Sequence, residues 1–178
     1  MNRFILAEDV RDCATFLCDQ HVNKMIIEEA QMLCTAVRLK MPAFARRADA
    51  HLYRMTHVNH PCAVWARENM GNFRVAYGYW LSMAVEYQHR FLRMHETYRK
   101  LSPVLREAVN DIEFERTFER KSRTPHPQCF GDLRSVCETD EPWPVNAYRL
   151  YYRAKGTTFR RPMKWSSRPA PFWLKEAA

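Results

Sequence analysis

Hydrophobic and polar positions separate most clearly along residues 19–39, DQHVNKMIIEEAQMLCTAVRL. This segment contains no Gly or Pro and opens on Asp19, a residue type that favours helix N-caps, so it predicts a helix of about five turns. At ~100° per residue, apolar side chains cover roughly 220° of its surface, which is typical of a helix packed on several sides. The remaining arc carries a polar row: His21, Lys24, Glu28, Gln31 and Thr35.

This polar row has two interpretations. A row that simply faced water would consist mostly of Lys and Glu, whereas this one has one of each beside a histidine, an amide and a hydroxyl. The row either faces solvent or is satisfied inside the core, or it forms the floor of an active site. The sequence leaves both interpretations open.

The rest of the pattern predicts an all-α fold, a single helical domain spanning residues 1–178. Further helices are expected at 10–18, 61–100, 104–109 and 145–155. The long helix has weak points at Gly71 and Gly78, and Gly156 is expected to end the last one. A loop with a broken turn of helix is expected at 41–56, and a long loop laid over the helices is expected at 111–142. Loops as long as the second one tend to be functional.

Composition narrows the class of protein. With 178 residues and 47% hydrophobic content, the chain can bury a real core. No apolar run reaches the ~18 residues that span a bilayer, and the N-terminal run is too short for a signal peptide. The six cysteines form no CxxC pair, and Cys13, Cys34 and Cys62 sit among apolar neighbours as core residues do. These features favour a reducing, cytoplasmic setting and no membrane partner.

The net charge of +8 favours an anionic partner, most commonly nucleic acid. The C-terminal tail interleaves cations with Phe159, Phe172 and Trp173, as expected where cations contact phosphates and rings stack on bases. The alternative is a tail whose tryptophans dock into the core while its basic residues stay in water. The candidate DNA-binding residues are Arg160, Arg161, Lys164, Trp165 and Arg168.

Two histidine motifs raise the question of a metal. His57-Val58-Asn59-His60-Pro61 fits a helix start, and its side chains can also bind a metal, a phosphate or a base edge. The spacing supplies no further ligands, so neither a metal nor another cofactor is assigned. Glu86-x-x-His89 matches half of a di-iron motif without a second copy, and a hydrogen bond or a pair with Arg90 is the expected explanation.

Three stretches together resemble a family of small, uncharacterised bacteriophage-borne proteins. They are Asp19-x-His21-Val22-x-Lys24-Met25-x-x-Glu28-x-x-Gln31, His57-x-x-His60-Pro61-Cys62-x-x-Trp65, and Ala147-Tyr148-Arg149-x-Tyr151-Tyr152 with Lys164-Trp165 and Arg168. The resemblance implies a phage genome and a host-cell cytoplasm, and names no reaction.

A shorter stretch resembles the phage pyrimidine-dimer glycosylases of the endonuclease V type, which are small, basic and all-α. Asp19-Gln20-His21 is followed seven residues later by Glu28, at the spacing of that family's catalytic glutamate. The family's arginines near the glutamate are absent here. Its nucleophile is an N-terminal amine exposed by removal of the first Met; Asn2 is bulky enough to favour retention of Met1, which itself carries an α-amine.

The polar row also suggests chemistry by itself. A partly buried Lys24 can become a nucleophile through a lowered pKa, Glu28 can move its proton or stabilise positive charge on the sugar, and His21 can act as an acid or an orienting donor. The alternative is an ordinary i, i+4 ion pair between Lys24 and Glu28. Gln31 completes the candidate catalytic set, and the candidate substrate-binding residues are Asp19, His57, Asn59, His60, Asn72, Tyr148, Arg149 and Tyr152.

Three functions follow from these observations. The first is a base-excision glycosylase/lyase that acts on modified or damaged pyrimidines in DNA. The second is a phage transferase that modifies a DNA base or a nucleotide. The third is a non-enzymatic, basic DNA-binding or host-takeover protein. The sequence does not indicate an oligomeric state.

Overall fold

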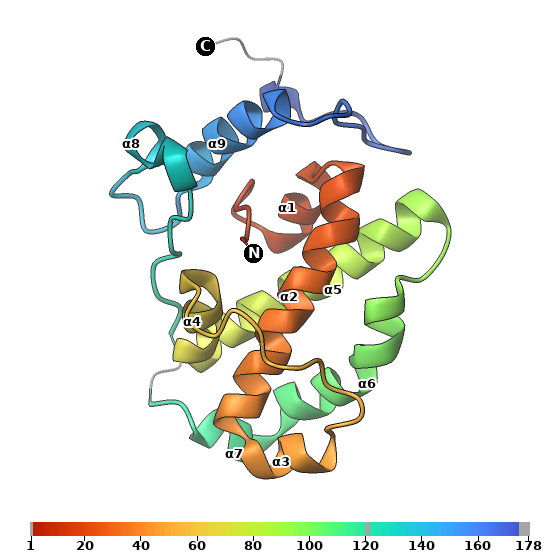
Figure 1. The fold of residues 1–178 in the computed structure, drawn as a ribbon, viewed down its shortest axis with the longest axis vertical. Helices are drawn as coiled ribbons and strands as arrows, with labels where there is room; N and C mark the ends of the chain where they lie inside the picture. Colours follow the sequence, from red (N-terminus) through yellow and green to blue (C-terminus); the bar gives the residue numbers. More distant parts are fainter. Residues whose placement is uncertain (1, 120–121, 175–178) are drawn as a thin grey trace.

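The computed structural model describes residues 2–119 and 122–174, and within them it contains helices and no strand, which confirms the all-α prediction (Figure 1). The α-helices are α1 (Val10–Phe16), α2 (Asp19–Lys40), α3 (Pro42–Arg47), α4 (Pro61–Glu68), α5 (Met70–Phe91), α6 (Glu96–Asn110), α7 (Ile112–Arg116), α8 (Arg134–Cys137) and α9 (Val145–Thr157). Two short 3-10 helices, η1 (Gly131–Leu133) and η2 (Phe172–Leu174), complete the elements. None of the described helices has the length and apolar character needed to cross a membrane.

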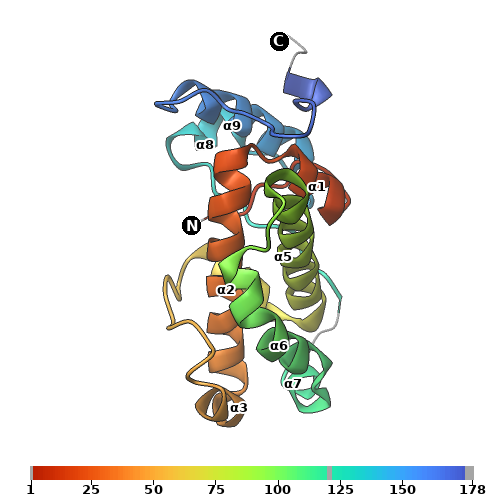
Figure 2. The ribbon, with the colours of Figure 1, turned by 90° about the vertical axis from the view of Figure 1, so that its right-hand side faces the viewer.

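Helix α2 is the central element and runs along most of the molecule. It packs against α3, α4, α5 and α6, and Figures 1 and 2 show α5 lying beside it. Its bounds agree with the predicted helix, and its burial on several sides confirms the interpretation of its wide apolar arc. The N-cap is Cys18 rather than Asp19, which is instead the first helical residue.

The predicted 61–100 helix is divided by side-chain capping rather than by glycine. Asn69 interrupts it with an extended backbone, and its side chain accepts a hydrogen bond from the Asn72 amide at 2.8 Å, which starts α5. Leu92 ends α5 in the left-handed conformation, at φ 52°. Gly71 and Gly78 lie inside α5, because tertiary packing outweighs the ~1 kcal/mol helix penalty of glycine.

Two further helix boundaries differ from the prediction. Pro103 lies inside α6 and does not start a helix, because the buried apolar face of α6 continues across it from Leu101 to Ala108. Gly156 lies within the last turn of α9, which ends at Thr157.

The N-terminal segment is threaded through the core. Phe4, Ile5 and Leu6 are buried without forming a regular element. Arg3 is also buried, where its guanidinium pairs with Glu29 of α2 and lies 4.6 Å from the centre of the Trp65 ring. Because this segment is held in the core, the preceding residue Asn2 lies next to α2.

The C-terminal tail docks onto the helices. The indole N–H of Trp165 donates to the Phe16 carbonyl at 3.0 Å, and Trp173 is buried. Arg168 pairs with the buried carboxylate of Glu86, which also pairs with Arg90. The expectation that the tail's tryptophans dock is thus confirmed, and Glu86 has the ion-pair role expected for it.

Candidate active-site pocket

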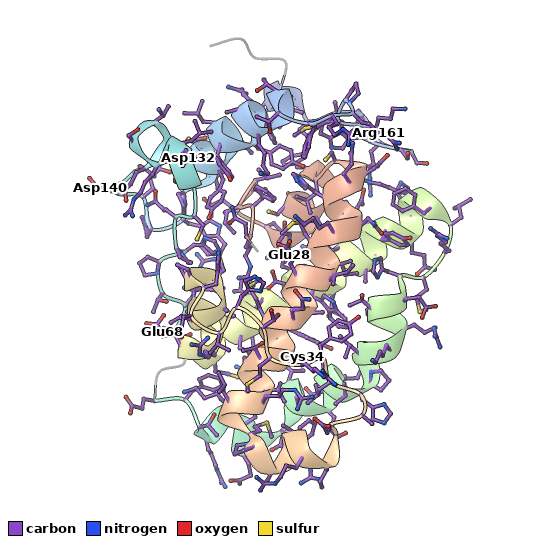
Figure 3. All side chains as sticks on the ribbon, viewed as in Figure 1. Glu28, Cys34, Glu68, Asp132, Asp140 and Arg161 are labelled. Atoms are coloured by element: carbon purple, nitrogen blue, oxygen red, sulfur yellow. The ribbon has the colours of Figure 1, made fainter. Side chains whose placement is uncertain are left out.

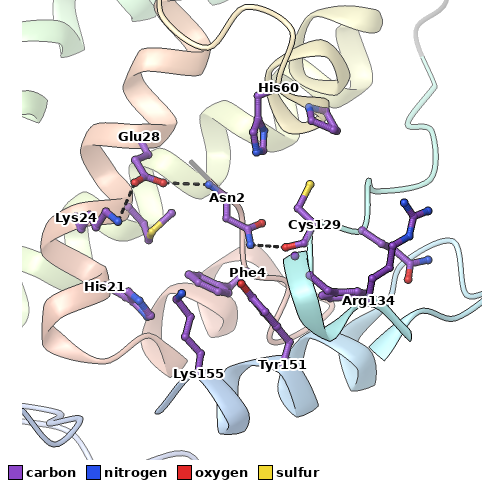
Figure 4. A pocket seen from close by; sticks show the side chains of 15 residues that line it. Asn2, Phe4, His21, Lys24, Glu28, His60, Cys129, Arg134, Tyr151 and Lys155 are labelled. Atoms are coloured by element: carbon purple, nitrogen blue, oxygen red, sulfur yellow. Dashed lines mark hydrogen bonds and ion pairs between the residues drawn. The ribbon is translucent and has the colours of Figure 1, made fainter. Parts of the chain in front are cut away.

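A pocket of about 530 Å³ opens beside the N-terminal half of α2 (Figure 4). Its walls come from α2, the N-terminal segment, the start of α4, the loop before α8, and α9. Three members of the predicted polar row, His21, Lys24 and Glu28, line it together with His60. The first three members of the row thus line a pocket, whereas Gln31 and Thr35 do not.

Glu28 lies at the centre of the pocket's hydrogen bonding. Its Oε2 accepts a hydrogen bond from the backbone N–H of Asn2 at 3.0 Å, and its Oε1 lies 3.3 Å from Nζ of Lys24. Among the described residues that line the pocket, Glu28 is the only carboxylate. Its side chain is 13% exposed, whereas that of Lys24 is 67% exposed. The expected partial burial of Lys24 is therefore absent, and any nucleophilic role depends on the adjacent carboxylate instead.

The side chain of His21 is fixed by the aromatic residues around it. Its Nδ1 shares a 2.8 Å hydrogen bond with the hydroxyl of Tyr152, and its ring stacks on Phe4 at a centroid distance of 4.7 Å. Burial, followed by the nearby charges of Lys155 and Lys24, lowers the pKa of His21 to about 3. His21 is thus neutral at pH 7, a state that suits an orienting role better than that of an acid.

The wall facing α2 contains residues that the sequence pattern did not identify as candidate site residues. The Asn2 amide group donates to the Cys129 carbonyl at 2.9 Å, which ties the N-terminal segment to the long loop. Tyr151 and Lys155 extend from α9 toward the pocket, and Arg134 lines it from α8 (Figure 4). Two features of the sequence pointed to this wall: the i, i+4 spacing of Tyr151 and Lys155, and the length of the 111–142 loop. The sequence does not show that these residues lie opposite α2; only the fold does.

Several predicted substrate-binding residues serve the framework instead and do not line the pocket. Tyr152 supports His21 and also accepts from the Cys18 amide. The Tyr148 hydroxyl joins the Pro127 carbonyl to the Cys129 amide, which fixes the loop beside the pocket. Their polar groups are thus occupied by the chain itself.

Apart from His60, the other predicted residues lie outside the pocket lining as well. Asp19 binds Ser166 and Arg90, the Arg149 guanidinium donates to the Leu6 carbonyl, and Asn72 bonds to Trp65 and Thr124. Gln31 is half-buried one turn beyond Glu28 on α2, and His57 and Asn59 are exposed before α4. His60 is the N-cap of α4, where its Nδ1 accepts from the Cys62 amide at 3.2 Å.

The basic tail divides into two groups. Trp165 and Arg168 are engaged with Phe16 and Glu86, whereas Arg160, Arg161 and Lys164 are exposed. Figure 3 shows Arg161 near the periphery and Glu28 on α2 near the middle of the molecule. Phe159, directly before the exposed arginines, lies 5.1 Å from the His21 ring between centroids. The exposed cations therefore begin next to one side of the pocket.

No protein-family model matches this chain, and searches of curated proteins and of solved structures likewise produced no match.

Proposed function

We propose that this protein is a DNA base-excision glycosylase/lyase that acts on modified or damaged pyrimidines in the cytoplasm of a phage-infected host. The observation that carries the proposal is the 3.0 Å contact between the Asn2 amide and Glu28 inside the pocket. In the endonuclease V type glycosylases that residues 19–28 resemble, the catalytic groups are a glutamate and an N-terminal amine. Here the residue at the matching glutamate position lies beside the N-terminal segment and the amine of Lys24.

The pocket has the features that a flipped nucleotide requires. Its volume lies within the roughly 300–1,000 Å³ range of small-molecule sites. The half-buried ring of Tyr151 offers an aromatic face on which an extruded base can stack. Lys155 adds positive charge for the flanking phosphates, and the exposed arginines Arg160 and Arg161 extend it along the tail.

In this mechanism Glu28 is the general base. It takes a proton from the Lys24 ammonium, and the free amine attacks C1′ of the deoxyribose while the bond from C1′ to the base breaks. The base leaves with the electron pair and takes up a proton. The attached nitrogen loses a proton and forms an imine as the ring oxygen leaves and is protonated. Removal of a C2′ proton then expels the 3′ phosphate, and water releases the amine.

Borohydride trapping tests this proposal because borohydride reduces a protonated imine to a stable amine. The protein is incubated with ultraviolet-irradiated DNA and with duplexes that carry deoxyuridine, with and without borohydride. We expect a covalent protein–DNA adduct that Lys24→Ala abolishes and that Lys100→Ala, at an exposed lysine outside the pocket, leaves unchanged. Mass spectrometry of the trapped peptide identifies the amine. An adduct on the N-terminal peptide would keep the reaction class and reassign the nucleophile.

The two other functions are alternative outcomes of the same experiments. No adduct and no strand nicking on any of these DNAs would refute the glycosylase. Altered nucleosides in phage DNA made with the gene, by mass spectrometry, would then indicate the transferase. DNA binding that His21→Ala and Glu28→Ala leave intact, and that the Arg160 and Arg161 substitutions abolish, would indicate a binding protein.

A further inference from the structure

A second group of reactive side chains lies at the edge of the pocket. The ligand atoms of His60, Cys62 and Cys129 all lie within 4.8 Å of one another. His60 and Cys62 come from the start of α4, and Cys129 comes from the long loop, 67 residues after Cys62. The fold therefore gathers three potential metal ligands that no sequence motif connects. None of them has a part in the glycosylase steps.

The spacing of the two sulfurs suits one metal ion. Cys62 Sγ and Cys129 Sγ lie 3.7 Å apart, and both cysteines are free. Two thiolates bound to a tetrahedral Zn²⁺ at ~2.3 Å each are separated by roughly 3.8 Å, so the sulfurs already stand at the edge length of such a site. His60, as the third ligand, would complete one face of the tetrahedron.

The surroundings also favour a dication with two thiolates. Cys62 is fully buried, and a buried thiolate without a partner is costly, whereas Zn²⁺ with two thiolates forms a unit with no net charge. Thiolate and imidazole ligands together select zinc over the harder cations magnesium and calcium.

We infer that His60, Cys62 and Cys129 form a zinc-binding site with one open coordination position. Two of its ligands, His60 and Cys129, line the pocket, so an ion held by them would lie at the pocket wall. Three protein ligands with a free fourth position are the arrangement of catalytic rather than structural zinc sites. Water or an oxygen of a bound phosphate is the class of ligand that would fill it.

Cobalt titration tests this inference without reference to DNA chemistry. The 178-residue protein is reduced, freed of metal with a chelator, and titrated with Co²⁺ and then Zn²⁺. We expect one equivalent of Co²⁺ to bind with thiolate-to-cobalt charge-transfer absorption, and Zn²⁺ to displace it. The variants Cys129→Ser and His60→Asn, the second of which keeps a capping side chain, should lose more than the roughly 10–100-fold in affinity that removal of an outer-shell partner costs.

Cys137→Ser is the matched control, since Cys137 is a buried thiol on α8 outside the cluster. It should bind the metal as tightly as the unaltered protein. The inference is overturned if the reduced protein takes up no metal, or if Cys129→Ser binds as tightly as the Cys137→Ser control. It is also overturned if Cys62 and Cys129 form a disulfide on oxidation while the reduced form binds neither ion.

Discussion

Acidification should weaken the fold through His21, the buried histidine of the pocket wall. Burial lowers its folded-state pKa to about 3, whereas the unfolded chain has the ordinary value of about 6.5. Above pH 6.5 neither state binds the proton. Below it the unfolded chain takes up a proton that the folded protein excludes, so stability is lost as the pH falls from about 6.5 toward 3.

The size of the effect follows from these two pKa values. Between pH 7 and pH 5 the proton stabilises the unfolded state by about 2 kcal/mol, while the folded state gains almost nothing. Urea unfolding followed by circular dichroism at both pH values measures the difference. The variant His21→Gln should lose about 2 kcal/mol less than the unaltered protein over this interval, whatever its stability at pH 7. Subtraction removes the contribution of His126, which is also buried with a lowered pKa.

Two observations would refute this reasoning. One is an equal loss of stability in the unaltered protein and in His21→Gln between pH 7 and pH 5. The other is a titration of the His21 ring near pH 6.5, followed by nuclear magnetic resonance in the folded protein. Either would mean that the imidazole is not sealed between Phe4 and Tyr152 as the structure shows.

Three further predictions concern charged residues. Glu29→Gln leaves the guanidinium of Arg3 buried without its counter-charge. It should lower the free energy of unfolding, measured by urea titration, by about 3–5 kcal/mol. A loss below about 1 kcal/mol would contradict the burial of the Arg3–Glu29 ion pair. Replacing both Arg160 and Arg161 with Ser should weaken the salt dependence of DNA binding and leave the free energy of unfolding unchanged. The slope of the logarithm of the binding constant against the logarithm of the salt concentration should fall by ~0.9 per lost phosphate contact, and an unaltered slope would mean that these arginines do not contact DNA. Arg168→Ala should speed trypsin cleavage of the tail, and unchanged cleavage would show that its ion pair does not anchor the tail.

The sequence predicted best where one physical signal dominates. Helix α2 has a continuous apolar arc without Gly or Pro, and its bounds were predicted to within one residue at its C-terminal end. The break at Asn69 was missed because it depends on a side-chain cap that competes locally with a strong helical pattern. The predicted helix at 104–109 begins too late, because the buried face of α6 continues through Pro103 from earlier residues.

The sequence predicted only the side of the pocket that α2 forms. Helical periodicity placed His21, Lys24 and Glu28 on one face, and the structure brings all three to the pocket. Their partners Asn2 and Lys155 come from the two ends of the chain, and no local pattern connects them to α2. Polar residues such as Asn72 and Tyr152 were expected to bind substrate, because a sequence does not reveal whether a polar group's partner is a ligand or another part of the chain.

The most direct test of the account compares a pocket carboxylate with an exposed one by single-turnover strand nicking on the DNA that gives a trapped adduct. Glu28 faces the pocket, whereas Glu113 is exposed on α7. The account predicts that Glu28→Gln keeps its unfolding free energy within about 1 kcal/mol but slows nicking by roughly 10²-fold or more, and that Glu113→Gln at an exposed site changes neither. Nicking at the normal rate in folded Glu28→Gln would contradict it.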